Sequence, residues 1–269
     1  MNLCRCFWNF CLDLYEKRRM IWDLSLNDFK GRFSHSMFGV FWAFVQPLVA
    51  ILVYWFVFEV GFKSPPVDDV PFILWFTPAY VSWLYFSETV VYSSVCLSEY
   101  SYLVKKINFR TSVLPVVKVL SNLFLHLFFV GFLFFINIVY GKPVHLIWFQ
   151  CIYYMLAMCI FSLGIGFLTA SIALFFRDIT QIVQVFLQVG FWLTPIFYSA
   201  DNLSPTLQLV LKLNPMFYIT RGYRDCFIYE IPFYHRIGTS LYFWIVCAVV
   251  FMAGALTFHK MRPHFADVL

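Results

Sequence analysis

The sequence has few charged residues. Asp, Glu, Lys and Arg together make up 12% of its 269 positions, whereas 62% are hydrophobic and 22% are aromatic. Soluble domains carry about 25% charged and about 45–50% apolar residues. A soluble chain could not cover this much apolar surface, so the sequence predicts an all-α membrane protein. Its length accommodates about six spans of about 20 residues with short loops.

A nucleotide-binding P-loop is also missing. The pattern G-x-x-x-x-G-K-[ST] occurs nowhere, and the Gly141-Lys142 pair has Ile136 where the earlier glycine would stand. We therefore expect that this chain does not bind ATP in the usual P-loop way. If the protein is an active transporter, its energy must come from another source.

Motifs of metal-dependent and nucleophilic enzymes are absent as well. No HExxH or GxSxG pattern occurs, and the eight cysteines include no CxxC pair. His126 stands alone within an apolar run, which is typical of a structural histidine rather than a metal ligand. We predict no catalytic residues and no metal site, so the chain is expected not to be an enzyme.

Carboxylates are scarce inside the apolar runs. Only Glu88 lies well inside one. We expect its carboxyl either to take part in function, or to form an interhelical hydrogen bond or face a cavity. An ion-coupled carrier should show internal repeats and several buried ionisable residues, and neither is evident. The net charge of +5 does not indicate nucleic acid, because the basic residues flank apolar runs.

Apolar runs of helical length predict the six transmembrane helices. Their approximate ranges, within a transmembrane domain at 37–258, are 38–58, 72–97, 113–140, 146–176, 179–197 and 237–258. Residues 198–236 contain prolines, charges and apolar stretches too short to cross, so we expect a re-entrant helical hairpin before the last span. Gly164-x-Gly166 in the fourth span is expected to allow close helix packing.

The N-terminal segment 1–36 has a different pattern. Trp22, Leu26, Phe29 and Phe33 recur at i, i+4, i+7 and i+11, which predicts an amphipathic interface helix along the membrane surface. Lys and Arg are concentrated in this segment, at 98–112 and in the tail 259–269. The positive-inside rule therefore predicts that both termini are cytoplasmic.

Four stretches carry a family resemblance. Residues 32–42 read RFSHSMFGVFW and precede Gln46-Pro47; residues 103–109 read LVKKINF and precede Leu114-Pro115. FRDI at 176–179 and TPIFY at 194–198 follow, and then LNPM at 213–216 with Tyr223-Arg224. In this order and spacing they resemble the membrane subunit of type-2 ABC exporters for polysaccharides. One departure is Arg110, which stands where the family often has proline.

The resemblance implies a homodimer of this chain joined by two copies of a separate ATPase, which would bind ATP and Mg²⁺. The cargo would be a lipid-linked glycan, such as O-antigen, capsule or teichoic acid, moved across a bacterial cytoplasmic (inner) membrane. One alternative is a type-2 ABC permease for a lipid, drug or haem. A second is a membrane-bound glycosyl- or acyltransferase, although the necessary cluster of Asp, His or Glu is not evident.

The resemblance also implies a cytoplasmic coupling segment at 98–112. Its predicted ATPase-docking residues are Glu99, Lys105, Lys106, Phe109 and Arg110. Alternatively, the two lysines only enforce topology and bind anionic lipid headgroups. At the turn after the fourth span, Arg177 and Asp178 either break the helix or, through Arg177, meet the pyrophosphate of the carrier.

Aromatic faces suit a sliding glycan, since they combine an apolar ring with a polar tip. The predicted substrate path consists of Trp75, Trp83, Tyr85, Glu88, Tyr92, Trp192, Tyr198, Tyr218, Arg221 and Arg224. Packing and interfacial anchoring explain many of these aromatics equally well. Arg221 and Arg224 either close the hairpin against Asp225 or Glu230, or attract an anionic glycan.

Overall fold

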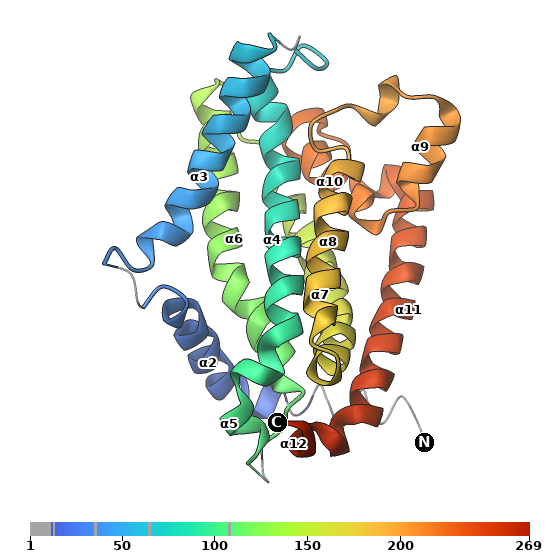
Figure 1. The fold of residues 1–269 in the computed structure, drawn as a ribbon. Coiled ribbons are helices and arrows are strands. Elements are labelled where there is room, and N and C mark those ends of the chain that lie inside the picture. Colours follow the sequence, from blue (N-terminus) through green and yellow to red (C-terminus); the bar gives the residue numbers. More distant parts are fainter. Residues whose placement is uncertain (1–11, 13, 35–36, 64–65, 107–108) are drawn as a thin grey trace.

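The computed structural model describes residues 12, 14–34, 37–63, 66–106 and 109–269. Within these ranges the chain is helical, with an isolated bridge between Val67 and Val70 in place of any strand. Parts of the predicted interface and coupling segments, at 1–11, 13, 35–36 and 107–108, lie outside the described residues. Figure 1 shows the long helices side by side, with α2, α5 and α12 at one end.

The long helices overlap the six ranges predicted as spans. They are α3 (Phe41–Trp55), α4 (Phe72–Glu99), α6 (Val113–Val139), α7 (Cys151–Phe175), α8 (Asp178–Leu193) and α11 (Ile237–Met261). Helices α4 and α11 extend a few residues beyond the predicted ends. The π-helical turn η1 (Phe56–Gly61) continues α3, and the 3₁₀ turn η2 (Leu146–Gln150) precedes α7. The short helices are α2 (Arg18–Gly31), α5 (Ser101–Val104), α9 (Pro205–Lys212), α10 (Pro215–Arg224) and α12 (Phe265–Val268).

Four helical segments of the described chain are long and apolar enough to cross a membrane. They are Phe41–Gly61, Val113–Val139, Leu146–Phe175 and Phe233–Val268. Helix α8 has 16 residues, and α4 is rich in Ser, Thr, Tyr and Trp. Most of α4 is buried among α6, α7, α8 and α10, so it meets protein rather than lipid and does not require a uniformly apolar surface.

Helix α8 ends four residues before the boundary predicted from the sequence. Its last residue is Leu193, and Thr194 already has an extended backbone, with its hydroxyl donating to the Gly190 carbonyl at 2.7 Å. Pro195 is the physical reason, because proline disfavours helical geometry in the residue before it. The segment at 194–198 is therefore a non-helical connection rather than part of a span.

Residues 198–236 contain two short helices, α9 and α10, connected at Leu213 and Asn214. Both helices begin with proline, which is pre-organised for a first helical turn. The side chain of Asn214 caps α10 by accepting from Met216 N at 3.0 Å, and it donates to Thr194 Oγ1 at 2.8 Å. The hairpin is thereby attached to the end of α8.

Helices α7 and α11 approach each other closely where two glycines meet. A Cβ on Gly164 would lie 2.8 Å from Phe251 Cα, and a Cβ on Gly254 would lie 2.2 Å from the Gly164 carbonyl oxygen. A Cβ on Gly166 would lie 3.0 Å from the Ser93 side chain. The predicted close packing at the Gly164-x-Gly166 motif is confirmed.

Candidate functional site

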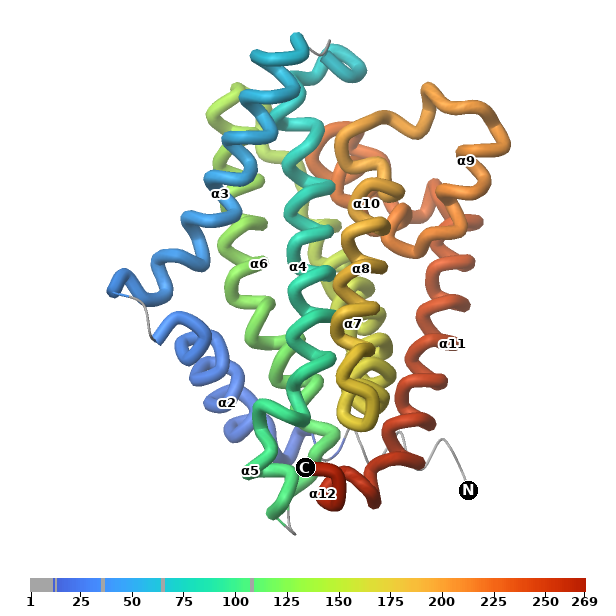
Figure 2. The backbone as a smooth tube through the Cα atoms, in the orientation of Figure 1, coloured from blue at the N-terminus to red at the C-terminus, as the bar shows by residue number. Residues whose placement is uncertain are grey.

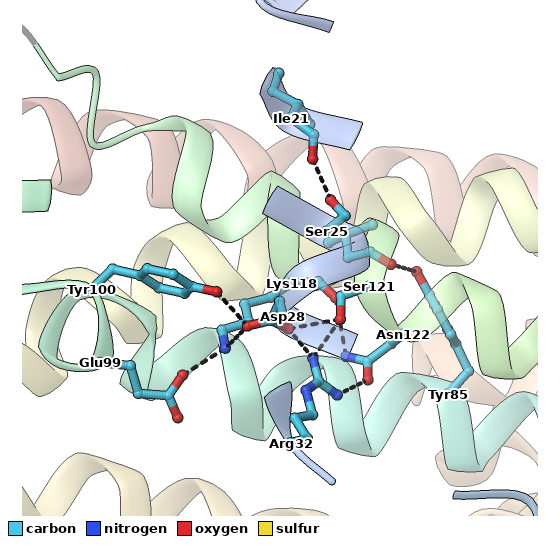
Figure 3. A network of polar contacts seen from close by, with 11 residues as sticks. Ile21, Ser25, Asp28, Arg32, Tyr85, Glu99, Tyr100, Lys118, Ser121 and Asn122 are labelled. Carbon is cyan, nitrogen blue, oxygen red and sulfur yellow. Dashed lines mark hydrogen bonds and ion pairs between the residues drawn. The ribbon is translucent and has the colours of Figure 1, made fainter. Parts of the chain in front are cut away.

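A buried ion network joins α2 to α4 and α6 (Figure 3), near the end of the bundle that carries α5 and α12 (Figure 1). Asp28 of α2 is its centre. The carboxylate accepts from Lys118 Nζ at 2.5 Å, Arg32 Nη2 at 2.6 Å, Ser121 Oγ at 2.7 Å and Tyr100 OH at 2.8 Å. Three segments that are distant in sequence are thus held by one carboxylate.

Lys118 extends the network to α4. Its Nζ also lies 2.6 Å from Glu99 Oε2, and the lysine side chain is 2% exposed whereas Glu99 is 47% exposed. Arg32 Nη1 donates to Asn122 Oδ1 at 2.5 Å, and its guanidinium lies 3.8 Å from the Tyr92 ring centroid. Two acidic and two basic side chains balance in charge, as buried ions must to avoid a large desolvation cost.

The environment of Asp28 keeps its carboxyl ionised. Burial alone would raise the pKa of Asp28, but the charges of Arg32 and Lys118, with hydrogen bonds from Lys118 and Ser121, lower it to about 2. Asp28 is therefore negative at physiological pH.

The face by which α2 packs on the bundle differs from the apolar stripe predicted from the sequence. Its buried residues are Ile21, Ser25 and Asp28, at i, i+4 and i+7. Trp22 is 53% exposed, although its ring makes an edge contact with Phe124 at 5.2 Å. The strongest contacts of α2 with α6 are therefore polar. In the sequence, the i, i+4 spacing of Asp28 and Arg32 indicates an ion pair on this face of α2, and our prediction did not use it.

The predicted coupling residues divide into two groups. Glu99 belongs to the ion network, and Phe109 packs against the apolar cluster at the lower ends of α4, α6 and α7. Lys105 and Lys106 are exposed just after α5, and Arg110 is half-buried. The exposed lysines and the buried network are thus separated by the short helix α5.

Arg177 and Asp178 lie exposed at the turn between α7 and α8. Asp178 is the first residue of α8, where a negative charge is favourable next to the unpaired backbone N–H groups.

A second polar cluster fixes the hairpin to the bundle around Arg224. This guanidinium donates to the carbonyls of Trp75 at 3.0 Å, Pro195 at 2.6 Å and Ile196 at 2.7 Å. It also lies 3.5 Å from the centroid of the Trp75 ring. Arg224 is 5% exposed, so it stabilises the non-helical connection after α8. Its polar contacts are to backbone carbonyls rather than to Asp225 or Glu230.

The charged neighbours of Arg224 have other partners. Arg221 lies 3.3 Å from Asp201, at the surface. Asp225 is fully buried and forms an ion pair with Arg236, a pairing that the sequence analysis did not predict. These contacts bind α10 both to the segment before α9 and to the start of α11.

Several predicted path residues are buried on α4. Trp75 donates from its indole to Tyr229 OH at 3.0 Å, and Trp83 packs against Gly190. Tyr85 donates to the Val119 carbonyl at 3.1 Å. A small cavity between α4 and α6 is lined by eight residues, among them Tyr85, Glu88, Asn122 and His126. The structure therefore brings Tyr85 and Glu88 together.

The remaining path residues lie toward the hairpin. Tyr218 is within 3.1 Å of both Tyr153 OH and Ser240 Oγ. Tyr198 donates to the Leu193 carbonyl at 2.9 Å. Trp192 is 57% exposed, with its ring stacked on Phe197 at 5.3 Å. In the described residues no group of three or more His, Cys, Asp or Glu side chains is arranged to hold a metal ion.

Comparison with known proteins finds relatives that are similar over most of the chain. A permease of an O-antigen export system, RfbA from Klebsiella pneumoniae, is 25% identical over 243 residues, covering 90% of this chain and 92% of the relative. RfbA from Myxococcus xanthus, also named an O-antigen export system permease protein, is 27% identical over 262 residues, covering 95% and 97%. The profile of the ABC-2 type transporter family matches residues 21–228. The chain is a member of the ABC-2 type transporter family.

Proposed function

We propose that this chain is the membrane-spanning subunit of an ATP-driven exporter that moves a lipid-linked, O-antigen-like polysaccharide across the bacterial cytoplasmic membrane. The observation that carries the proposal is the similarity, over 90% or more of both chains, to relatives named as O-antigen export permeases. The missing P-loop agrees with it, because ATP and Mg²⁺ would then bind to a separate ATPase.

In the proposed assembly, two copies of this chain join two ATPase subunits. Each copy crosses the membrane six times with both termini in the cytoplasm, and α9 and α10 form the re-entrant hairpin. The distribution of Lys and Arg supports this orientation. It places α2, α5 and α12 on the cytoplasmic side, where an ATPase would dock on residues 98–112.

The ion network suits the transmission of motion from that docking surface. Glu99 ends α4 immediately before α5, and Lys118 joins it to Asp28 within 2.6 Å on either side. A push on α5 would therefore move α2 and the start of α6 together with α4, rather than deforming one loop. Discrete packed elements of this kind transmit displacement because they are not continuously deformable.

The proposal is tested by deleting the gene in its own host and measuring surface polysaccharide. Deletion should remove the glycan from the surface and leave the lipid-linked form inside; expression of this chain should restore it. Restoration should fail when the P-loop lysine of the ATPase is replaced. Unchanged surface polysaccharide after deletion, or ATP hydrolysis by the purified chain alone, would contradict the proposal.

A further inference from the structure

Helix α8 presents a row of amide side chains on its outer surface. Gln181, Gln184 and Gln188 are all exposed, and they follow one another at i, i+3 and i+7. None of the three side chains hydrogen-bonds to another described residue. The helix runs beside α4 and α7 (Figure 2), and α7 belongs to a segment, Leu146–Phe175, that is long and apolar enough to cross a membrane.

The rest of α8 divides into two apolar faces. Val183, Leu187 and Phe191 pack against the core. A second face is exposed and apolar, with Ile182 at 47% and Phe186 at 74%. Lipid suits this second face, but it cannot satisfy amides, whose donors and acceptors are costly to leave unpaired in hydrocarbon. The amide row therefore requires a polar occupant.

A second copy of α8 fits this row poorly. Close pairing of membrane helices uses small residues that allow the backbones to approach. The exposed residues of α8 are Gln, Val, Ile, Phe, Trp and Leu, apart from the terminal Asp178. Its one glycine, Gly190, already packs against Trp83 of the same chain, since a Cβ there would lie 2.9 Å from Trp83 Cη2.

A hydrated, hydroxyl-rich chain fits the row well. Each amide offers two donors and one acceptor oxygen, which match sugar hydroxyls in either direction. The amides carry no charge, so they would bind each hydroxyl weakly and let the chain slide. Trp192, four residues beyond Gln188, continues the same row and offers an exposed ring of the kind on which sugars stack.

We propose that Gln181, Gln184 and Gln188, with Trp192 at their end, form a neutral hydrogen-bonding track for the glycan. This inference rests on the proposed export function and specifies the surface that meets the cargo. The three glutamines cover about 10 Å of the helix, and the track with Trp192 covers about 16 Å, given a rise of about 1.5 Å per residue. Ile182 and Phe186 on the neighbouring face are assigned to lipid.

The first test asks whether the row faces water. Single cysteines replace each glutamine, with Ile182→Cys and Phe186→Cys as controls on the same helix. The reagent is a small cationic methanethiosulfonate, applied to membrane vesicles of the host that contain the complete transporter. Peptide mapping identifies the label, because α8 contains no native cysteine. Labelling at the glutamine positions should be at least about tenfold faster, because thiolates form in water and not in lipid.

The second test asks whether the row meets glycan. Replacement of all three glutamines by leucine should slow the appearance of surface polysaccharide by about fivefold or more, through loss of hydrogen bonds. The amount of chain bound to its ATPase should not change. Replacement by asparagine should retain most of the export, whereas Ile182→Leu should leave it unaltered.

Three results would overturn the track. Equal, slow labelling at glutamine and control positions would mean that the row is not hydrated. Oxidative cross-linking of Gln184→Cys between two copies, without labelling, would assign the row to a protein contact. Normal export by the triple leucine variant would exclude a glycan contact. If instead the unaltered chain exports no glycan, the proposed function fails, whatever the labelling pattern.

Discussion

The Nζ of Lys118 lies 2.5 Å from Oδ1 of Asp28, so that side chains ninety positions apart in the sequence form one buried ion pair. The lysine also neutralises Glu99, and it is therefore the only bridge between the two carboxylates drawn in Figure 3. Removal of Lys118 would leave two carboxylates, one of them buried, with Arg32 as the remaining cation of the network. The energetic role of this bridge can be measured directly.

Lys118→Met is expected to destabilise the chain by about 3–5 kcal/mol, because the buried Asp28 loses its closest cation. The measurement is thermal unfolding of the purified protein in detergent. Lys105→Met, which removes an exposed lysine, is the matched control and should change stability by less than about 0.5 kcal/mol. Adding Asp28→Asn to Lys118→Met should restore part of the loss; equal melting temperatures for all the variants would refute the bridge.

The ion network should weaken in acid. The pKa of Asp28 is lowered from 3.8 to about 2, so the folded state favours the ionised form. This contributes about 2 kcal/mol that is fully present above about pH 4 and is lost as the pH falls toward about 2. Melting temperature measured from pH 6 to pH 2 should show this loss, and Asp28→Asn should remove that component of the pH dependence. An identical pH profile in the variant would contradict the assignment.

Arg224→Lys should detach the hairpin despite retaining the charge. One ammonium group cannot stack on Trp75 and reach three carbonyls in the way that the planar guanidinium does. We expect a loss of at least about 3 kcal/mol in stability and faster proteolysis within 198–236. Arg221→Lys alters an exposed pair and is the control. Equal proteolysis rates in the two variants would argue against the anchoring role.

Gly254→Ala should separate α7 from α11. The added Cβ would lie 2.2 Å from the Gly164 carbonyl oxygen, a backbone atom that cannot move aside. Gly238→Ala on the same helix is the control, since a Cβ there meets nothing within 4 Å. We expect Gly254→Ala to be destabilised by about 1–3 kcal/mol or more in thermal unfolding, and Gly238→Ala to be unchanged or slightly stabilised. Equal stability would mean that the helices tolerate wider spacing.

Lys105→Glu combined with Lys106→Glu tests docking of the ATPase. Both lysines are exposed beyond α5, so the change should leave folding intact while reversing the charge of the proposed surface. Co-purification of the ATPase with this chain should fall about tenfold, as expected for the loss of complementary charge. Lys212→Glu, exposed on α9 near the opposite end of the bundle, is the control. Unchanged co-purification and ATP hydrolysis would assign the lysines to topology and lipid.

The sequence predicted the long helices because apolar runs of helical length are a strong signal. It placed the end of α8 wrongly, since TPIF is apolar and only the effect of Pro195 on Thr194 distinguishes it from a span. It predicted that the apolar stripe of α2 lies along the membrane surface, and it gave no prediction for the face formed by Ile21, Ser25 and Asp28, which packs on the bundle. The partners of that face, Lys118 and Ser121, lie on α6, about ninety residues further along the chain, where no local pattern in α2 indicates them.

The candidate sites show the same limit. The resemblance implied a glycan cargo, and we expected aromatic side chains to meet it, but Trp75 and Trp83 on α4 are covered by other helices. The sequence alone assigned no role to the exposed glutamines of α8, because a few uncharged polar residues are common within membrane-spanning helices. Their meaning depends on which face of α8 the other helices leave uncovered, and this is a property of the tertiary structure.

The pairing of Asp28 with Lys118 also sets an order of events during synthesis. Helix α2 leaves the ribosome ninety residues before its lysine partner, while Arg32, one turn away, is available to Asp28 almost at once. We expect this early pair to shield the carboxylate until α6 has been inserted. Docking of the N-terminal helix is therefore a late step of biogenesis, and a ribosome stalled before Lys118 emerges should carry an α2 that is still accessible to protease.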